Sequence, residues 1–170
     1  MLEILALFAG LSLVQAQPPT VQDLERAEAC AFSETRCAPD STRAAAMSCI
    51  RTPSIGGTEA FEACLLSMTD RCYERGRVAD RAANDRVILV CSAHSRAAIR
   101  EAVDAWLIEA ETFAPAHAVE QYRALRTQVP ARAEGDAAAH GSTPVERAAS
   151  HEGVWASFAR FLWQQRARYP

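Results

Sequence analysis

The spacing of apolar residues along the chain predicts helices and gives no segment with convincing period-two alternation. Val21, Leu24 and Ala31 recur at helical spacing, and Thr20 with Asp23 three residues later resembles a capping box. Comparable patterns predict helices over about 41–51, 58–74, from 79 or 84 to 113, 115–129, and from 144 towards the C-terminus. The chain therefore reads as an all-α bundle of about five to six helices.

Two segments near the C-terminus contrast in their signals. Thr143, Pro144 and Glu146 form the clearest helix start in the chain, with an N-cap, a proline at the first helical position and a glutamate at the third. Residues 130–142 are rich in Ala, Gly and Glu and nearly lack large apolar residues, which predicts a mobile, exposed linker.

The N-terminus predicts export. Residues 4–14 form an apolar run that is too short for a bilayer, which needs about 20 residues. Small residues at Val14 and Ala16 suit a cleavage site, although no Lys or Arg precedes the run. We expect a signal peptide over 1–16, an N-terminal helical hairpin over 17–57, a helical domain over 58–170, and no stable membrane insertion once the leader is removed.

The cysteines are the most informative residues in the composition. Because an even number in an exported chain indicates disulfides, we expect three bridges and a periplasmic or secreted protein. All six lie after the leader: Cys30, Cys37, Cys49, Cys64, Cys72 and Cys91.

A repeated sequence motif surrounds these cysteines. Cys30 and Cys64 each follow Glu-Ala, and each text ends with Arg-Cys, at Cys37 and Cys72. This predicts two related helix–turn–helix hairpins. Cys64 and Cys72 fall about 12 Å apart on one predicted helix, beyond the roughly 7 Å that a disulfide tolerates. Of the fifteen connectivities, the simplest pairs Cys37 with Cys49 and Cys72 with Cys91, and joins Cys30 to Cys64 across a pseudo-twofold axis.

Residues 60–168 resemble the lysozyme inhibitor LprI-like family of bacterial envelope proteins. The resemblance rests on a Cys-x7-Cys pair, a further Cys on a long helix with a Trp, a Tyr-x-x-Leu element and a C-terminal Trp-x-x-aromatic element with an arginine. In this chain these are Cys64, Cys72, Cys91, Trp106, Tyr122, Leu125, Trp155, Phe158 and Arg160. The resemblance implies a helical envelope protein, and inhibition of lysozyme describes only few members of that family.

The chain also departs from the family pattern. Trp163 stands where the family usually has another cysteine, and the arginine that normally follows the aromatic residue is displaced to Arg160. Glu109 and Glu111 occupy the region of an expected asparagine. Trp163 lies off the apolar stripe of the last helix, which makes it a candidate for an exposed binding contact or for the cover of a disulfide.

No residue pattern indicates catalysis, a metal or a cofactor. The four histidines lack ligand spacing, and no Gly-x-Ser-x-Gly element is present. Glu101, Glu109 and Glu111 read with Arg100 as a solvated helix face rather than as paired carboxylates. A net charge of −3 gives no electrostatic case for nucleic acid.

Two functional hypotheses follow. The first is a non-enzymatic binding protein whose partner is a lysozyme or another cell-wall hydrolase, which the arginine-rich chain could meet at its catalytic carboxylates. The densest group of arginines for this role lies between residues 71 and 86. The alternative is a structural or envelope-interaction protein without inhibitory activity, which would bind through its 130–142 linker and its helical faces.

Overall fold

A computed structural model describes residues 17–33, 35–51 and 57–169, and the expected signal peptide lies outside them. The described residues form six helices and no strand, as the sequence predicts. These are α1 (Val21–Phe32), α2 (Asp40–Arg51), α3 (Gly57–Gly76), α4 (Arg81–Ala110), α5 (Ala116–His140) and α6 (Pro144–Arg166). None of these helices carries an apolar stretch that could cross a membrane.

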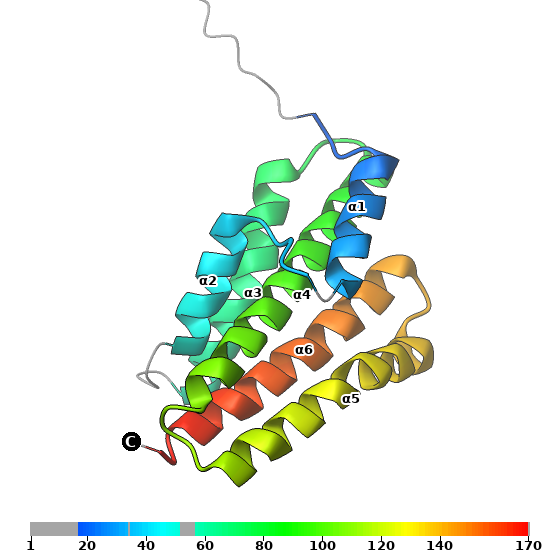
Figure 1. Cartoon of the computed structure of the whole chain (residues 1–170). Coiled ribbons are helices and arrows are strands. Elements are labelled where there is room, and N and C mark those ends of the chain that lie inside the picture. The colour runs from blue at the N-terminus through cyan, green and yellow to red at the C-terminus, as the bar shows by residue number, and fades with distance from the viewer. Residues whose placement is uncertain (1–16, 34, 52–56, 170) are drawn as a thin grey trace, which may run out of the picture.

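Helix α4 is the centre of the bundle. It packs against α1, α2, α3 and α6, while α5 lies chiefly along α6 at one side (Figure 1). Ala93, Ala97, Ala98 and Ala102 on α4 are all fully buried, and such small side chains let the surrounding helices approach closely. Ile50, Leu65, Val103 and Leu162 belong to one continuous core. The predicted boundary at residue 57 therefore does not separate two cores.

Both predicted helix starts are present with their caps. The Thr20 side chain accepts a hydrogen bond from the Asp23 backbone N–H, and Thr143 does the same for Glu146. In each case the acidic side chain accepts a hydrogen bond from the backbone N–H of the cap residue. Local sequence thus fixes the first turns of α1 and α6.

The predicted mobile linker is wrong over most of its length, because α5 continues to His140. Val129, Ala133 and Ala137 are buried at four-residue spacing, so this half of α5 has an apolar face made mostly of alanine. Alanine is the strongest helix former, but because its side chain is small, these positions do not stand out in the sequence as an apolar face. Pro130 lies inside the helix, and its side chain is exposed.

The three disulfides differ from the predicted pairing. The structure joins Cys30 to Cys37 and Cys49 to Cys64, in place of the predicted Cys37–Cys49 and Cys30–Cys64 pairs. The third predicted pair, Cys72–Cys91, is formed. Helix α1 ends at Phe32, so the chain turns back and brings Cys37 to a Cα–Cα distance of 5.7 Å from Cys30.

The disulfides do not form the predicted repeat of two hairpins. Helices α3 and α4 pack against each other and are joined by Cys72–Cys91. Helices α1 and α2 pack on α4 and α2 also packs on α3, but α1 and α2 do not pack on each other. The similar text around Cys30 and Cys64 therefore lies in two different structural settings.

Candidate functional site

The middle of α4 carries polar side chains into the protein interior. Arg96 and Arg100 are each 3% exposed and Glu101 is 7% exposed, although the sequence places Arg100 and Glu101 on a solvated face. That interpretation is wrong for both residues. It describes Glu109 and Glu111 better, since these form ion pairs near the surface with Arg51 and Arg123.

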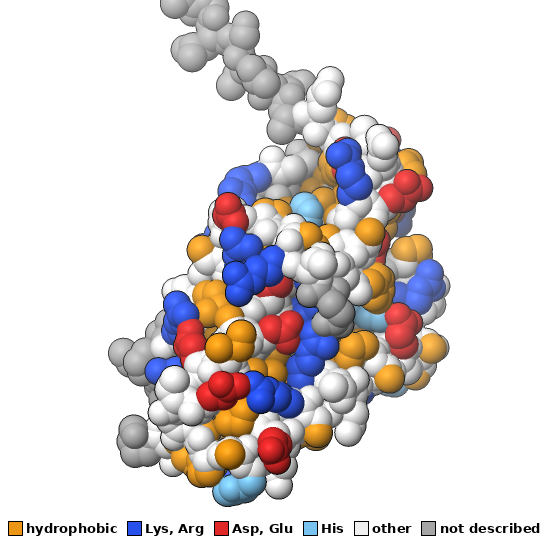
Figure 2. All heavy atoms as spheres, viewed as in Figure 1, with side chains coloured by type: hydrophobic (Ala, Val, Ile, Leu, Met, Phe, Trp, Pro, Cys, Tyr) orange, Lys and Arg blue, Asp and Glu red, His pale blue; other side chains and the backbone are white. Residues whose placement is uncertain are grey.

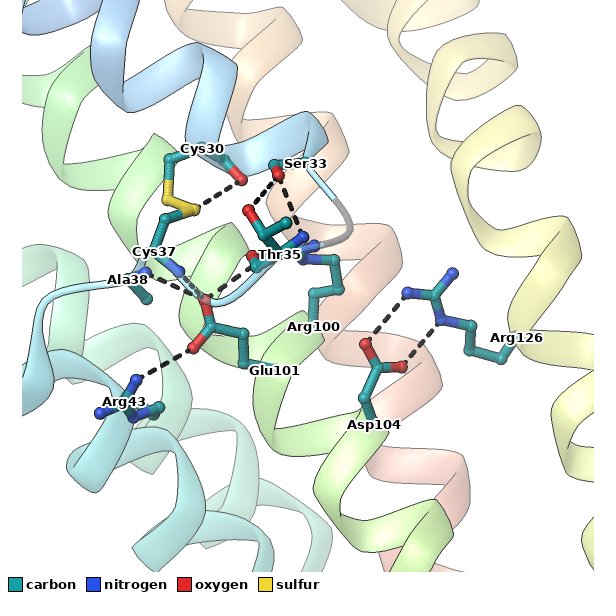
Figure 3. Close-up of polar contacts among 10 residues, drawn as sticks. All are labelled: Cys30, Ser33, Thr35, Cys37, Ala38, Arg43, Arg100, Glu101, Asp104 and Arg126. Carbon is teal, nitrogen blue, oxygen red and sulfur yellow. Dashed lines mark hydrogen bonds and ion pairs between the residues drawn. A yellow bond between two sulfur atoms is a disulfide. The ribbon is translucent and has the colours of Figure 1, made fainter.

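Glu101 is buried because it binds the backbone that connects α1 to α2. Its Oε1 accepts hydrogen bonds from the backbone N–H groups of Cys37 and Ala38, at 2.8 and 2.9 Å (Figure 3). Its Oε2 lies 3.6 Å from Nη1 of Arg43 on α2. The two N–H groups satisfy Oε1, and the Arg43 charge lies near Oε2, which has no hydrogen-bond partner of its own.

Arg100 holds the same connection at a second point. Its Nη2 donates to the Thr35 carbonyl at 3.0 Å and lies 3.5 Å from Oε1 of Glu101 (Figure 3). The Cys30–Cys37 disulfide is a third point of attachment. We call residues 33 and 35–39, the described part of this connection, the stapled loop. Adjacent residues on α4 and one disulfide therefore fix an irregular segment whose Thr35 and Arg36 are exposed.

A second buried carboxylate belongs to α6, another of the helices that pack on α4. Glu152 is 6% exposed and accepts hydrogen bonds from hydroxyl groups on α3 and α4. The donors are Thr69 at 2.6 Å, Ser95 at 2.8 Å and Ser92 at 3.0 Å. This carboxylate bridges three helices, and the sequence analysis did not single it out.

Four of the five family-motif residues are core or core-edge residues rather than members of an exposed site. Trp106 is fully buried, and its ring lies 5.9 Å from that of Tyr122, which in turn lies 5.8 Å from Phe161. Trp155 is 5% exposed, and Phe158 packs at the core edge. The fifth, Arg160, pairs with Glu62 and so links α6 to α3.

Trp163, the predicted binding contact, is half-buried at the core edge. Its ring centroid lies 5.1 Å from that of Phe61 on α3. The arginines between residues 71 and 86 are mostly exposed, and several bind back to their own chain: Arg71 to the Ser67 carbonyl, Arg75 to the Arg71 carbonyl and Arg86 to the Pro19 carbonyl.

The buried histidine of the bundle lies beside the arginines. His151 on α6 is 7% exposed, and its Nε2 lies 3.7 Å from Oε2 of Glu134. Burial lowers the pKa of His151, and the Arg96 charge lowers it further against the opposing carboxylates. Burial also lowers the pKa of His94. Among the described residues, no group of His, Cys, Asp and Glu could hold a metal ion.

Comparison of the chain with protein-family models, with curated proteins and with solved structures finds no match. A sequence signal for the buried polar residues does exist in retrospect. Ser92, Arg96 and Arg100 recur every fourth position on one face of α4, within a stretch in which half of the other residues are alanine.

Proposed function

We propose that this protein is a non-enzymatic binding protein of the periplasm or the extracellular space that presents the stapled loop to a partner protein. The three attachments of that loop carry the proposal: Glu101 to two N–H groups, Arg100 to a carbonyl, and the Cys30–Cys37 disulfide. A segment ordered before binding loses less conformational entropy when it meets its partner.

The cysteines support the proposed compartment. Three disulfides account for all six thiols, and disulfides persist in oxidising, extracytoplasmic environments. An exported protein that meets harsh conditions gains from such cross-links, because each restricts the unfolded chain. The expected leader also supports a periplasmic or secreted location.

The side chains around the loop suit a protein surface. Phe32 is 58% exposed at the end of α1, and the exposed Thr35 and Arg36 follow it. Aromatic residues and arginine supply much of the energy of protein interfaces. Arg36 could meet a carboxylate in the cleft of a lysozyme or another cell-wall hydrolase, which uses a pair of acidic residues. The resemblance over residues 60–168 is the reason to name that partner.

Binding and inhibition assays with the oxidised protein test this proposal. A panel of lysozymes would be titrated with the protein while lysis of bacterial cell walls is followed by turbidity. We expect micromolar inhibition or binding of at least one enzyme, and Arg36→Glu should weaken it by about tenfold or more. Arg147→Glu makes the same charge change at an exposed position on α6 and should leave it unchanged. Absence of both binding and inhibition across the panel would refute the lysozyme proposal.

A second candidate function is an envelope-interaction protein without inhibitory activity, and one surface favours it. A groove of about 580 Å³ runs between α5 and α6, with Leu125, Val154 and Phe158 on its walls. Leu125 is 42% exposed there. Affinity capture from oxidised envelope extracts separates the two functions, since only the first predicts a muramidase among the captured proteins. A capture that depends on Leu125 but not on Arg36 would favour this second function.

A further inference from the structure

The α5–α6 hairpin has two long faces, and only one of them packs against other helices. Glu134 of α5 and His151 of α6 lie on the packed face, where Phe32 of α1 and Arg96 of α4 adjoin them. The groove of about 580 Å³ lies on a different face, and all its lining residues fall within 125–136 of α5 and 150–161 of α6. We call it the hairpin groove. Since α5 lies along α6 at one side of the bundle (Figure 1), no third helix of the described chain lines this groove.

The residues that line the hairpin groove recur at alternating spacings of four and three on both helices. On α5 these residues are Leu125, Val129, Arg132 and Asp136, and α6 repeats the same spacing from Ser150 to Phe161. Such a spacing is typical of the strip along which one helix packs into another. At 1.5 Å per residue the strip is about 16 Å long on each helix. The groove therefore has the shape and the length to hold about three turns of a further helix.

One end of the hairpin groove is apolar and incompletely covered. Leu125 is 42% exposed, and Val154, Phe158 and Phe161 are half-buried. The Phe158 and Phe161 rings stack with their centroids 6.1 Å apart. Because apolar surface gains free energy when it leaves water, this end favours an occupant with apolar side chains.

The other end of the groove carries a positive charge without a partner. Arg132 is exposed and makes no hydrogen bond or ion pair with any described residue. Of the other charged residues in the lining, Arg160 pairs with Glu62, and Asp136 lies 3.8 Å from Nε2 of His140. On the face seen in Figure 2, by contrast, acidic and basic side chains lie beside one another. An acidic residue of an occupant would complement Arg132.

The wall formed by α6 admits the close approach of another backbone. Ser150, Gly153 and Ser157 are small, and a Cβ atom added at Gly153 would contact nothing within 4 Å beyond the backbone of its own helix. Small residues at a contact allow a short distance between packed helices. The exposed rims at Leu125 and Arg132 disfavour a small molecule or a lipid chain, because sites for such ligands bury most of the ligand surface. A second copy would present the same hollow, since a twofold interface uses one patch on both copies.

We infer that the hairpin groove binds an amphipathic helix of a partner protein. The apolar side chains of that helix lie against Leu125, Val154 and Phe158, and an acidic residue about two turns away pairs with Arg132. Recognition of a helix by an apolar groove is a recurring mode of protein interaction. This inference rests on the second candidate function above, whose partner it specifies, and it does not involve the stapled loop.

A pair of synthetic peptides tests this inference. Each is about 15 residues long and carries leucines at alternating spacings of three and four on a background of alanine and glutamine. In one peptide a glutamate flanks the leucines at each end, so that either direction of the helix can meet Arg132, and in the other peptide lysine replaces both glutamates. Fluorescence anisotropy of the labelled peptides is followed while the oxidised protein is added. We expect a Kd of about 100 µM or below for the glutamate peptide and about fivefold weaker binding of the lysine peptide. No binding up to about 500 µM, or equal binding of both peptides, would overturn the inference.

Reversal of the charge in the groove checks the acidic residue. Arg132→Glu changes an exposed residue of α5, so the variant should bind the lysine peptide about fivefold more tightly than the glutamate peptide. Arg81→Glu makes the same change at the exposed start of α4 and should keep the preference of the wild type. A preference for the glutamate peptide that persists in Arg132→Glu would contradict the inferred pairing.

Two glycines provide a matched pair of variants for the groove itself. Gly153 lines the groove and Gly135 does not, but both are exposed within helices and have open space for a Cβ atom. Leucine favours a helix more than glycine does, so Gly153→Leu and Gly135→Leu should both fold. Only Gly153→Leu fills the groove, and it should weaken binding of the glutamate peptide about tenfold or more. If it does not fold, Leu125→Glu carries the test, with Ile108→Glu as its control, since Ile108 is 61% exposed on α4. Equal effects within the pair used would overturn the site.

Three other occupants have outcomes of their own, each of which would overturn the inference. A dimer in sedimentation that the glutamate peptide dissociates would assign the groove to a second copy. Peptide binding that appears only when residues 1–16 are removed would assign it to the chain's own apolar segment at 4–14. Saturable binding of laurate that displaces the peptide would assign a lipid chain. If the peptides fail while capture from envelope extracts still depends on Leu125, the second candidate function stands and only its helical partner is refuted.

Discussion

Two buried carboxylates, Glu101 on α4 and Glu152 on α6, make different kinds of contact. Glu152 accepts three hydrogen bonds from hydroxyl groups on α3 and α4, so it joins regular helices to one another. Glu101 accepts two from the backbone of an irregular loop and shares its charge with Arg43 and Arg100. The first is surrounded by neutral groups that satisfy it. The second belongs to a charged cluster in which Nε and Nη1 of Arg100 have no hydrogen-bond partner.

The difference separates a structural element from a candidate functional one. Hydroxyl donors on helices have another partner available, since Ser and Thr can bond to a carbonyl one turn earlier on their own helix. The backbone N–H groups of Cys37 and Ala38 have no such alternative on a helix. Arg100 also has no other carboxylate. The Cys37 and Ala38 N–H groups therefore depend on Glu101 alone, and the loop to which they belong exposes Thr35 and Arg36.

The largest effect that tests this comparison is expected from Glu101→Ala. It leaves two backbone N–H groups unsatisfied and Arg100 buried without a counter-charge, so the free energy of unfolding should fall by about 3–5 kcal/mol. Glu152→Ala should cost less, about 1–3 kcal/mol, because the freed hydroxyl groups can turn to helix carbonyls. Denaturant unfolding of the oxidised variants measures both values.

Controls for that prediction lie on the same helix and in the loop itself. Glu109→Ala removes a surface ion pair with Arg51 and should cost no more than about 1 kcal/mol. In the milder Glu101→Gln variant, amide hydrogen exchange at Cys37 and Ala38 should accelerate, while Glu152→Gln should leave both amides protected. If Glu152→Gln loosens the loop as much as Glu101→Gln does, the two carboxylates are not distinct.

The sequence carries much of the fold and little of this distinction. Thr20 and Thr143 mark helix starts because a cap is a local interaction within four residues. The burial of Glu101 depends on the backbone of Cys37 and Ala38, which lie more than sixty positions away in the chain, at 64 and 63 residues. No helical period encodes such a contact, and a glutamate next to an arginine on a helix is typical of a solvated face.

The cysteines show the same limit. The excluded Cys64–Cys72 pair followed from the rise of one helix, which is local geometry. The choice between Cys37–Cys49 and Cys30–Cys37 depends instead on where α1 ends and on how the chain turns beneath Glu101. Those are tertiary contacts, and they give the shorter loop.

An intermediate effect is expected from removal of the Cys30–Cys37 disulfide. Its loop is the shortest of the three, with a sequence separation of 7, so it restricts the unfolded chain least. Cys30→Ala with Cys37→Ala should lower the free energy of unfolding by about 2 kcal/mol, and Glu101 should still hold the loop. Thermal unfolding and exchange at the Cys37 and Ala38 positions measure the two parts.

Peptide mapping checks the pairing on which that variant depends. An arginine separates each cysteine from the next along the chain, so trypsin under non-reducing conditions can divide every neighbouring pair. Linked peptides should join Cys30 to Cys37, Cys49 to Cys64 and Cys72 to Cys91. A peptide that links Cys37 to Cys49 would contradict the loop geometry.

The smallest effect is a pH dependence of stability caused by His151, which lies beside Arg96. Burial, then the Arg96 charge, lowers the pKa of His151, so the unfolded state takes up a proton before the folded state does as the pH falls. Stability should be constant with respect to this group above its ordinary pKa near 6.5 and should decrease below it. Thermal unfolding of the oxidised protein between pH 7.5 and 5.5 should show a decrease that His151→Gln reduces. His117→Gln, at an exposed position on α5, should leave the decrease unchanged. Because part of the shift comes from a neighbouring cation, added salt should reduce the His151 contribution, whereas the His94 contribution, caused by burial alone, should persist.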